Sequence, residues 1–333
     1  MRFTRTFFFA FTFLFLSFSG ASVSAQEKQS NNSVLLVLNK NEANLAILDA
    51  ATMKILGKIS VGDSPHEVVI STDGKRAYVT NYGAQTPGNS LSIIDLTTRK
   101  ELKRVDLGGF LRPHGIVEMD GNIYFTSESS RTVARYNPTS DKIDWVMGTG
   151  QTATHMLVIS NDKKRLYTAN IASDTITAIN LGVPPGQQNI TQITVGKQPE
   201  AIDVSPDGKE VWVGLNAEGA IDVVDTASNK FKEKIKLGER PYRVEFTPDG
   251  KRVFATIPNT KEIIVLNAAT RKEIKRIKLD SAPMGIVFSK DGKTAFVSVV
   301  QTDGVLKIDT EKFEVLGKAE TGNAPDGLAV YGT

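Results

Sequence analysis

The histidines of this chain occupy equivalent places in its sequence. His66, His114 and His155 are the only three histidines in 333 residues, and each follows a Pro or Thr that begins a mostly apolar run. Imidazole nitrogens together with a carboxylate suit Zn, Cu and non-haem Fe, with ligand distances of about 2.0–2.2 Å for Zn. If the runs are equivalent strands of a repeat, we expect the three side chains to lie close together.

Four further runs of the same kind place other polar or soft groups at this position. They hold Glu200, Tyr242, Met284 and Asp326. In a closed ring, Asp326 and Glu200 would flank the three histidines, which gives an arc of five possible ligands. The sequence therefore predicts a divalent-metal site formed by His66, His114, His155 and Glu200. The alternative is that these histidines are solvated rim residues, or that they bond to backbone groups.

Catalysis at such a metal would need an open coordination position and an acid or base. Glu200, Asp326 and Tyr242 are the candidate catalytic groups because they share the position of the histidines. Arg112 and Arg240 lie beside the same runs and are candidate contacts for an anionic ligand, although an Arg next to a Pro is more often simply solvated.

The elements that must position these residues follow from an internal repeat of about 40 residues. Each apolar run leads into a turn such as Asp73-Gly74-Lys75, then a second strand, a third that ends in Asp or Asn, and a charged fourth. Turns of this type join adjacent antiparallel strands, and four strands per repeat is the unit of a propeller blade. Seven runs predict an all-β, seven-bladed β-propeller.

The two ends of the repeat region complete each other. Residues 34–38 match a second strand, whereas residues 325–331 match a first strand. We therefore expect one blade to be closed by strands from both termini, within a single propeller domain at 34–333 that follows a flexible segment at 26–33. Deleting 325–333 should open the ring.

Residues 1–25 have the pattern of a secretory signal peptide. Arg2 and Arg5 precede an apolar run of about a dozen residues, and Val23-Ser24-Ala25 offers small residues for cleavage. The run is too short to span a bilayer as a helix. Without the two arginines the formal charge falls from +3 to +1, so charge gives no reason to expect nucleic acid or an anionic membrane as a partner.

The absence of cysteine narrows the chemistry further. A chain without Cys has no disulfide, no thiolate metal site, no acylated lipoprotein anchor and no c-type haem attachment. A Gly-rich phosphate loop before a helix is also missing, which argues against a nucleotide cofactor. We expect one Zn, Cu or Fe ion as the cofactor if there is one.

Two short motifs resemble a known family. Tyr78-Val79-Thr80-Asn81 reads YVTN, and Tyr167-Thr168-Ala169-Asn170 is a close variant. With the Pro-led runs and Asp-Gly-Lys turns, the sequence resembles the YVTN-repeat β-propellers, which are related to the propeller domains of cytochrome d1 nitrite reductase and nitrous oxide reductase. The resemblance covers the mature chain and implies the fold; it implies no single activity, because propellers carry many.

Three functions remain open at this stage. The first is a periplasmic or secreted monomer that binds a small ligand, a metal or a protein partner at the mouth of the central channel, without a membrane anchor. The second is a metal-dependent lyase, hydrolase or oxidoreductase at the same mouth. The third is single-stranded nucleic-acid binding, which the small net charge disfavours.

Overall fold

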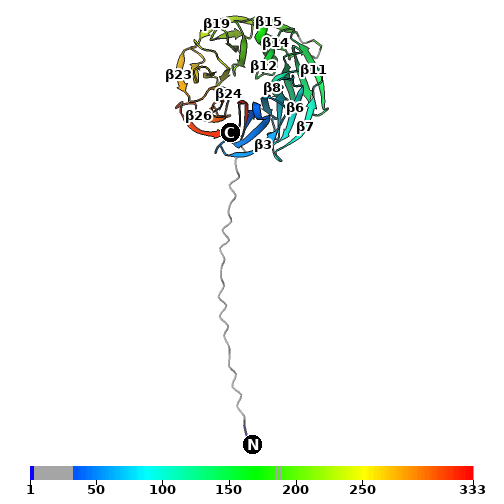
Figure 1. Ribbon diagram of the computed structural model, residues 1–333, viewed down its shortest axis with the longest axis vertical. Coiled ribbons are helices and arrows are strands. Elements are labelled where there is room, and N and C mark those ends of the chain that lie inside the picture. The colour runs from blue at the N-terminus through cyan, green and yellow to red at the C-terminus, as the bar shows by residue number, and fades with distance from the viewer. Residues whose placement is uncertain (4–32, 185, 188, 333) are drawn as a thin grey trace. The chain divides into compact units, whose positions relative to one another are not determined.

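The computed structural model describes residues 1–3, 33–184, 186–187 and 189–332. Within these ranges the chain forms seven four-stranded antiparallel sheets arranged in a ring, a seven-bladed β-propeller, as the repeat predicts (Figure 1). Most of the predicted signal peptide, at 4–25, lies outside the described residues. Among the residues that are described, no helix has the length and apolar character needed to cross a bilayer.

The first strand of every blade lies closest to the axis, where it contacts the first strands of the neighbouring blades. These strands are β4 (Pro65–Ile70), β8 (Pro113–Met119), β12 (Thr154–Ile159), β16 (Pro199–Val204), β20 (Arg243–Phe246), β24 (Pro283–Phe288) and β28 (Pro325–Tyr331). Only β20 begins later than its predicted Pro, although the N–H of Tyr242 still bonds to the Thr256 carbonyl at 2.8 Å. A Pro at strand entry costs no ladder bond.

The second strands are almost fully buried between the blades. They are β1 (Val34–Asn39), β5 (Arg76–Asn81), β9 (Asn122–Ser127), β13 (Arg165–Asn170), β17 (Glu210–Leu215), β21 (Arg252–Ile257) and β25 (Thr294–Val299). Their side chains pack against the next blade, as Leu36 and Val79 do within one cluster. The hydrophobic core therefore lies between neighbouring sheets, and each blade depends on the next for burial.

The third and fourth strands complete each sheet toward the outside. The third strands are β2 (Asn44–Asp49), β6 (Ser90–Asp95), β10 (Thr132–Asn137), β14 (Thr175–Asn180), β18 (Ala220–Asp225), β22 (Glu262–Asn267) and β26 (Gly304–Asp309). The fourth strands are β3 (Ile55–Ser60), β7 (Lys100–Asp106), β11 (Lys142–Gly148), β15 (Ile190–Thr194), β19 (Lys230–Lys236), β23 (Glu273–Lys278) and β27 (Val315–Glu320). Two 3-10 turns, η1 (Lys40–Glu42) and η2 (Ile171–Ser173), follow β1 and β13.

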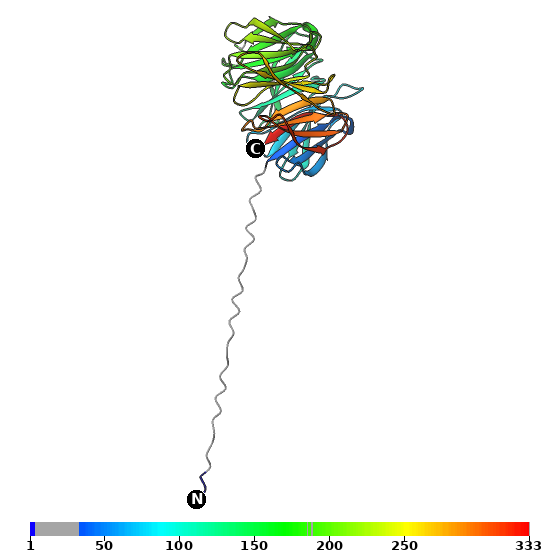
Figure 2. The ribbon, with the colours of Figure 1, turned by 90° about the vertical axis from the view of Figure 1, so that its left-hand side faces the viewer.

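The ring closes through the two ends of the chain, as predicted. β28 pairs antiparallel with β1, with Leu36 opposite Ala329 and Val34 opposite Tyr331. In Figures 1 and 2 the red C-terminal strand accordingly lies beside the blue strands that begin the domain. Because β28 pairs with β1 and also contacts the inner strands of both neighbouring blades, β4 and β24, the inner ring is continuous around the axis.

Candidate functional site

One end of the channel collects the second residue of every inner-strand repeat. We call this end the upper mouth and define it by His66, His114, His155, Glu200, Tyr242, Met284 and Asp326. In five of the seven blades, the residue directly before the inner strand is a non-glycine residue with positive φ. These residues are Ser64, Arg112, Ala153, Gln198 and Ala324. This left-handed conformation costs about 1–2 kcal/mol per residue, so the surrounding contacts must hold it.

Hydroxyl groups of the second strands fix the backbone of the upper mouth. Thr80, the Thr of the YVTN motif, donates to the carbonyl of His114 at 2.8 Å. Thr126 donates in the same way to the carbonyl of His155, and Ser298 to that of Asp326 at 2.8 Å. Each of these bonds joins one blade to the next. Each polar residue of the upper mouth named here is thus held in place by a hydroxyl group from the neighbouring blade.

The three histidines lie together, as their spacing predicts. The ring centres of His66 and His114 are 4.9 Å apart, and those of His114 and His155 are 3.7 Å apart. Tyr82, which follows β5, lies against this group with its ring centre 4.4 Å from that of His66. His114 is only 2% exposed. Neighbouring inner strands therefore bring three imidazoles into one contiguous cluster.

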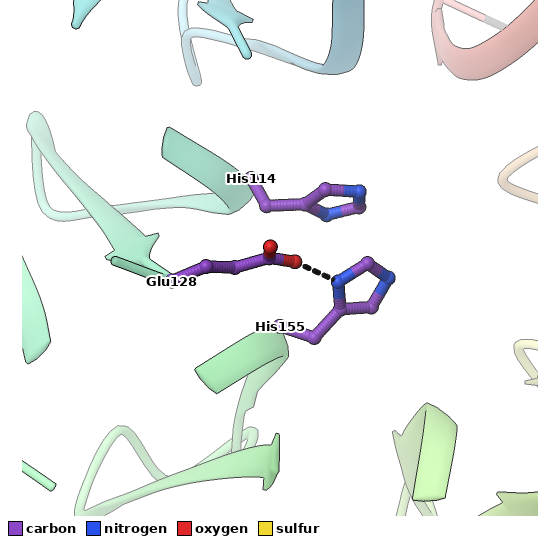
Figure 3. Close-up of side chains that lie close together, drawn as sticks. All are labelled: His114, Glu128 and His155. Carbon is purple, nitrogen blue, oxygen red and sulfur yellow. Dashed lines mark hydrogen bonds and ion pairs between the residues drawn. The ribbon is translucent and has the colours of Figure 1, made fainter. Parts of the chain in front are cut away.

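A carboxylate that the sequence reasoning missed completes this cluster. His114, Glu128 and His155 each offer a ligand atom within 4.8 Å of the others, as Figure 3 illustrates. Glu128 hydrogen-bonds to His155 Nδ1 through one oxygen and accepts the Tyr82 hydroxyl at 2.6 Å through the other. His114 Nδ1 is buried and has no hydrogen-bond partner among the described residues. A buried polar atom without a partner is costly unless something binds it.

Burial keeps two of the imidazoles, His66 and His114, neutral. Burial lowers the pKa of His66 to about 4, although the nearby Asp326 carboxylate opposes this effect. Burial, together with repulsion from His155 and His66, lowers the pKa of His114 well below its usual value. Burial would raise the pKa of Glu128, but the hydrogen bonds from His155 and Tyr82 outweigh it, so this pKa is lowered. A neutral imidazole and an ionised carboxylate are the forms that bind a metal.

The opposite side of the upper mouth is an ionic network. The Tyr242 hydroxyl donates to both oxygens of Asp326, at 3.0 and 3.1 Å, and Lys40 Nζ lies 3.0 Å from Asp326 Oδ2. One layer below, the Arg243 guanidinium bonds to the Glu67 carboxylate of a distant blade. Burial would raise the pKa of Asp326, but Lys40 and Arg243 lower it. These contacts link side chains from both sides of the channel.

Glu200 lies between the two sides. Its Oε1 atom is 3.9 Å from His155 Nε2, and its Oε2 atom is 3.2 Å from Arg240 Nη2 and accepts a hydrogen bond from Asn216. The other predicted anion contact, Arg112, stacks on Tyr82 at 4.6 Å and donates to the carbonyls of the 82–89 loop. Arg112 is thus engaged within the protein, whereas Arg240 is 47% exposed.

The residues that sequence reasoning missed share a position of their own. Tyr82, Glu128, Asn216 and Lys40 each directly follow the second strand of a blade. At this position they lie beside the beginnings of the inner strands, on the same face of the propeller. A comparison of this position across the repeats would have identified four polar side chains, as it did for the inner strands.

Comparison with known proteins supports the fold and a propeller family. Residues 157–292, from β12 to β24, match the family described as the cytochrome D1 heme domain, over less than half of the chain. Curated proteins give no match. The family match agrees with the predicted resemblance to propellers related to cytochrome d1.

Solved structures similar to this chain are propellers of several kinds. They include hydrazine synthase of Kuenenia stuttgartiensis (18% identity, TM-score 0.74, 85% of this chain and 94% of that chain) and a putative 6-phosphogluconolactonase of Bacteroides uniformis (14%, 0.76, 90% and 99%). Dihydro-heme d1 dehydrogenase NirN in complex with DHE is a third (14%, 0.67, 89% and 74%). At these identities the similarity establishes the fold alone.

The family match raises the question of whether a haem fits the upper mouth. A planar macrocycle needs an open slot beside its axial ligand. Here the described side chains already meet near the axis, where Tyr242 bonds to Asp326 and the rings of His114 and His155 lie 3.7 Å apart. A haem would have to displace these contacts, whereas a single ion fits among the imidazoles and carboxylates. The residues as placed therefore do not fit a haem.

Proposed function

We propose that this chain is an exported propeller module that binds one divalent transition metal at the upper mouth. The observation that carries the proposal is the buried Nδ1 of His114, which has no partner among the described residues, beside His155 and its two neighbouring carboxylates, Glu128 and Glu200. The family match and the NirN complex support the broader statement that related propellers are ligand- or heme-binding modules.

Hydrogen bonds to the histidines support their role as ligands. His66 Nδ1 donates to the Ser64 carbonyl at 2.9 Å, and His155 Nδ1 bonds to Glu128. An acceptor at one ring nitrogen fixes the orientation of the ring and leaves the other nitrogen for a metal, a common arrangement around metal-binding histidines. His66 and His155 would thus present Nε2.

The carboxylate ligand is either Glu200 or Glu128. Glu200 Oε1 faces His155 Nε2 at 3.9 Å, which suits two ligands of one ion, whereas Glu128 already holds His155 Nδ1. We therefore assign Glu200, together with His66, His114 and His155, to the metal and give Glu128 the role of orienting His155. Nitrogen and carboxylate ligands suit Zn, Cu or Fe.

Zinc titration of the mature chain, stripped of metal with a chelator, tests this assignment by calorimetry. We expect one site, a loss of at least about a hundredfold in affinity for His155→Ala, and a larger loss for Glu200→Gln than for Glu128→Gln. Met284→Leu, at the same repeat position in another blade, is the matched control and should bind as the wild type does. An absence of binding, or equal binding by His155→Ala, would refute the proposal.

An enzymatic use of the same metal is the second candidate. The observation that favours it is the Tyr242–Asp326 hydrogen bond beside Arg243, because it supplies an acid–base group at the same mouth. Burial and the Asp326 carboxylate raise the pKa of Tyr242 well above its usual value, so its hydroxyl stays protonated and orients Asp326, whose lowered pKa leaves it ionised as the base. Tyr242→Phe should then abolish turnover while zinc affinity stays unchanged; loss of both would assign Tyr242 a structural role.

The proposal on export and partners rests on the sequence pattern alone. We propose a periplasmic or secreted monomer, without a membrane anchor, that takes a small ligand or a protein partner at the upper mouth. The N-terminal sequence and the compartment of the processed protein test this: a start near Gln26 in the exported fraction supports it. An unprocessed chain in the cytoplasm would contradict it.

A further inference from the structure

The opposite end of the channel has a different chemistry. We call it the lower channel and define it by the fifth residue of each inner-strand repeat: Val69, Val117, Val158, Asp203, Glu245, Val287 and Ala329. All seven residues are partly exposed, although they belong to the inner strands and five of them also pack against the clusters between blades. Space for solvent or a ligand therefore reaches this depth from the lower face.

The lower channel is closed above by the Arg243–Glu67 ion pair. The third residues of the inner-strand repeats are buried in six of the seven blades, Met156 being the partly exposed one. Among them, Arg243 and Glu67 join two distant blades, and the Arg243 side chain is 5% exposed. A ligand in the lower channel is thereby separated from the upper mouth.

Asp203 and Glu245 form a hydrogen-bonded carboxyl pair in this otherwise apolar ring. Asp203 accepts the backbone N–H groups of Val204 and Phe246, each at 2.7 Å, which fixes its orientation. It also lines a cavity of about 430 Å³ together with Val117, Val158 and Phe246, and with the polar Asn161 and Thr247; Glu245 reaches this cavity only through its hydrogen bond to Asp203. The volume lies within the usual range of small-molecule sites.

The charge of this pair is not balanced locally. The other five members of the lower channel are Val or Ala, and the nearest cation that acts on Glu245, Arg243, is already paired with Glu67. Burial raises the pKa of Asp203 to about 7, and burial together with Asp203 raises that of Glu245. Glu67 adds to this effect. Because two ionised carboxylates have no hydrogen to share, the hydrogen bond between them places a proton on one of the two.

We propose that the lower channel binds a small organic ammonium ion, with its charged group on the Asp203–Glu245 pair and its apolar body against the valines. An ammonium group supplies donors to both carboxylates, and its arrival displaces the shared proton. The aliphatic wall discriminates against a strongly hydrated metal ion, which needs more oxygen ligands than two carboxylates offer. This inference is independent of metal binding at the upper mouth.

Calorimetry with n-butylammonium chloride on the full mature chain, in chelator-treated buffer, tests the inference. Because the cation competes with a proton, affinity should rise about tenfold from about pH 6 to about pH 8, with proton uptake by the buffer near pH 7. Two buffers of different ionisation enthalpy measure that proton. Neutral n-butanol should bind at least about tenfold more weakly than the ammonium ion.

Variants separate the carboxyl pair from the rest of the channel. Glu245→Gln should weaken n-butylammonium binding at least about tenfold and abolish the proton release. Asp203→Asn is the second variant and should do the same, with folding of both checked by circular dichroism. Glu118→Gln, at the lower end of β8 with its carboxylate bonded to Thr72, is the control that should leave binding unchanged. An absence of binding, equal binding of n-butanol, displacement by Mg²⁺, or full binding by Glu245→Gln would overturn the inference.

Discussion

Replacing Arg243 with Met should destabilise the propeller strongly, because it leaves a buried carboxylate without its cation. Arg243 and Glu67 are paired in the middle of the ring, with side-chain exposures of 5% and 12%. Breaking one partner of a buried ion pair costs about 3–5 kcal/mol. With an unfolding entropy of about 2 cal/mol/K per residue and about 300 residues, a loss of about 4 kcal/mol lowers Tm by about 6 °C.

Differential scanning calorimetry near neutral pH measures this change, with Arg240→Met as the control. Arg240 pairs with Glu200 but is 47% exposed, so its loss should cost less than about 1 kcal/mol. The double variant Arg243→Met, Glu67→Gln should recover part of the lost stability, because the unpaired charge is gone. Burial raises the pKa of Glu67, so the penalty in Arg243→Met should shrink as pH falls toward about 5 and the carboxyl gains a proton. A Tm within about 1 °C of wild type, or a double variant less stable than Arg243→Met, would refute the reasoning.

Three further predictions concern pH, closure and positioning. The pKa of His66 is about 4 in the folded protein and has its ordinary value in the unfolded chain, so between these values the unfolded metal-free chain binds more protons than the folded one. The free energy of unfolding should therefore fall by up to roughly 3 kcal/mol from about pH 6.5 to about pH 4. Urea unfolding across this range should show the fall in wild type and a smaller one in His66→Gln; parallel profiles would contradict it. Deleting 325–333 removes β28 and exposes the inner edge of β1, which then pairs only with β2, so size-exclusion chromatography should show an expanded or associated chain rather than a compact monomer. Thr80→Val removes the hydroxyl that donates to the His114 carbonyl, so it should lower the free energy of unfolding in urea by about 1–3 kcal/mol and weaken zinc binding. Unchanged zinc affinity would show that this hydrogen bond does not position the site.

The sequence was sufficient to predict the fold because each blade repeats the same landmarks. The Pro-led runs became the inner strands, and the second-strand character of residues 34–38 predicted closure by both termini, which the β1–β28 pairing confirms. The position shared by His66, His114 and His155 likewise predicted their proximity, because equivalent residues of adjacent inner strands converge on the axis.

The rest of the site depends on side-chain reach, which a repeat alignment does not contain. Glu128 directly follows β9, whereas His155 lies in β12 of the next blade, and only the fold shows that the Glu128 carboxylate reaches the His155 ring. The Arg243–Glu67 pair joins residues 176 positions apart, across the channel. The spacing of Arg243 and Glu67 in the sequence does not show that they form a pair. Which residues of non-adjacent blades meet across the channel is decided only when the ring closes.

X-ray absorption spectroscopy of the zinc-loaded mature protein tests the central claim most directly. The proposal predicts a first shell of nitrogen and oxygen at about 2.0–2.1 Å, with the outer scattering of at least two imidazoles, and loss of that signal in the His66→Ala, His114→Ala, His155→Ala variant. A zinc shell without imidazole scattering, or one unchanged by the triple substitution, would show that the metal binds elsewhere and that the upper mouth is not a metal site.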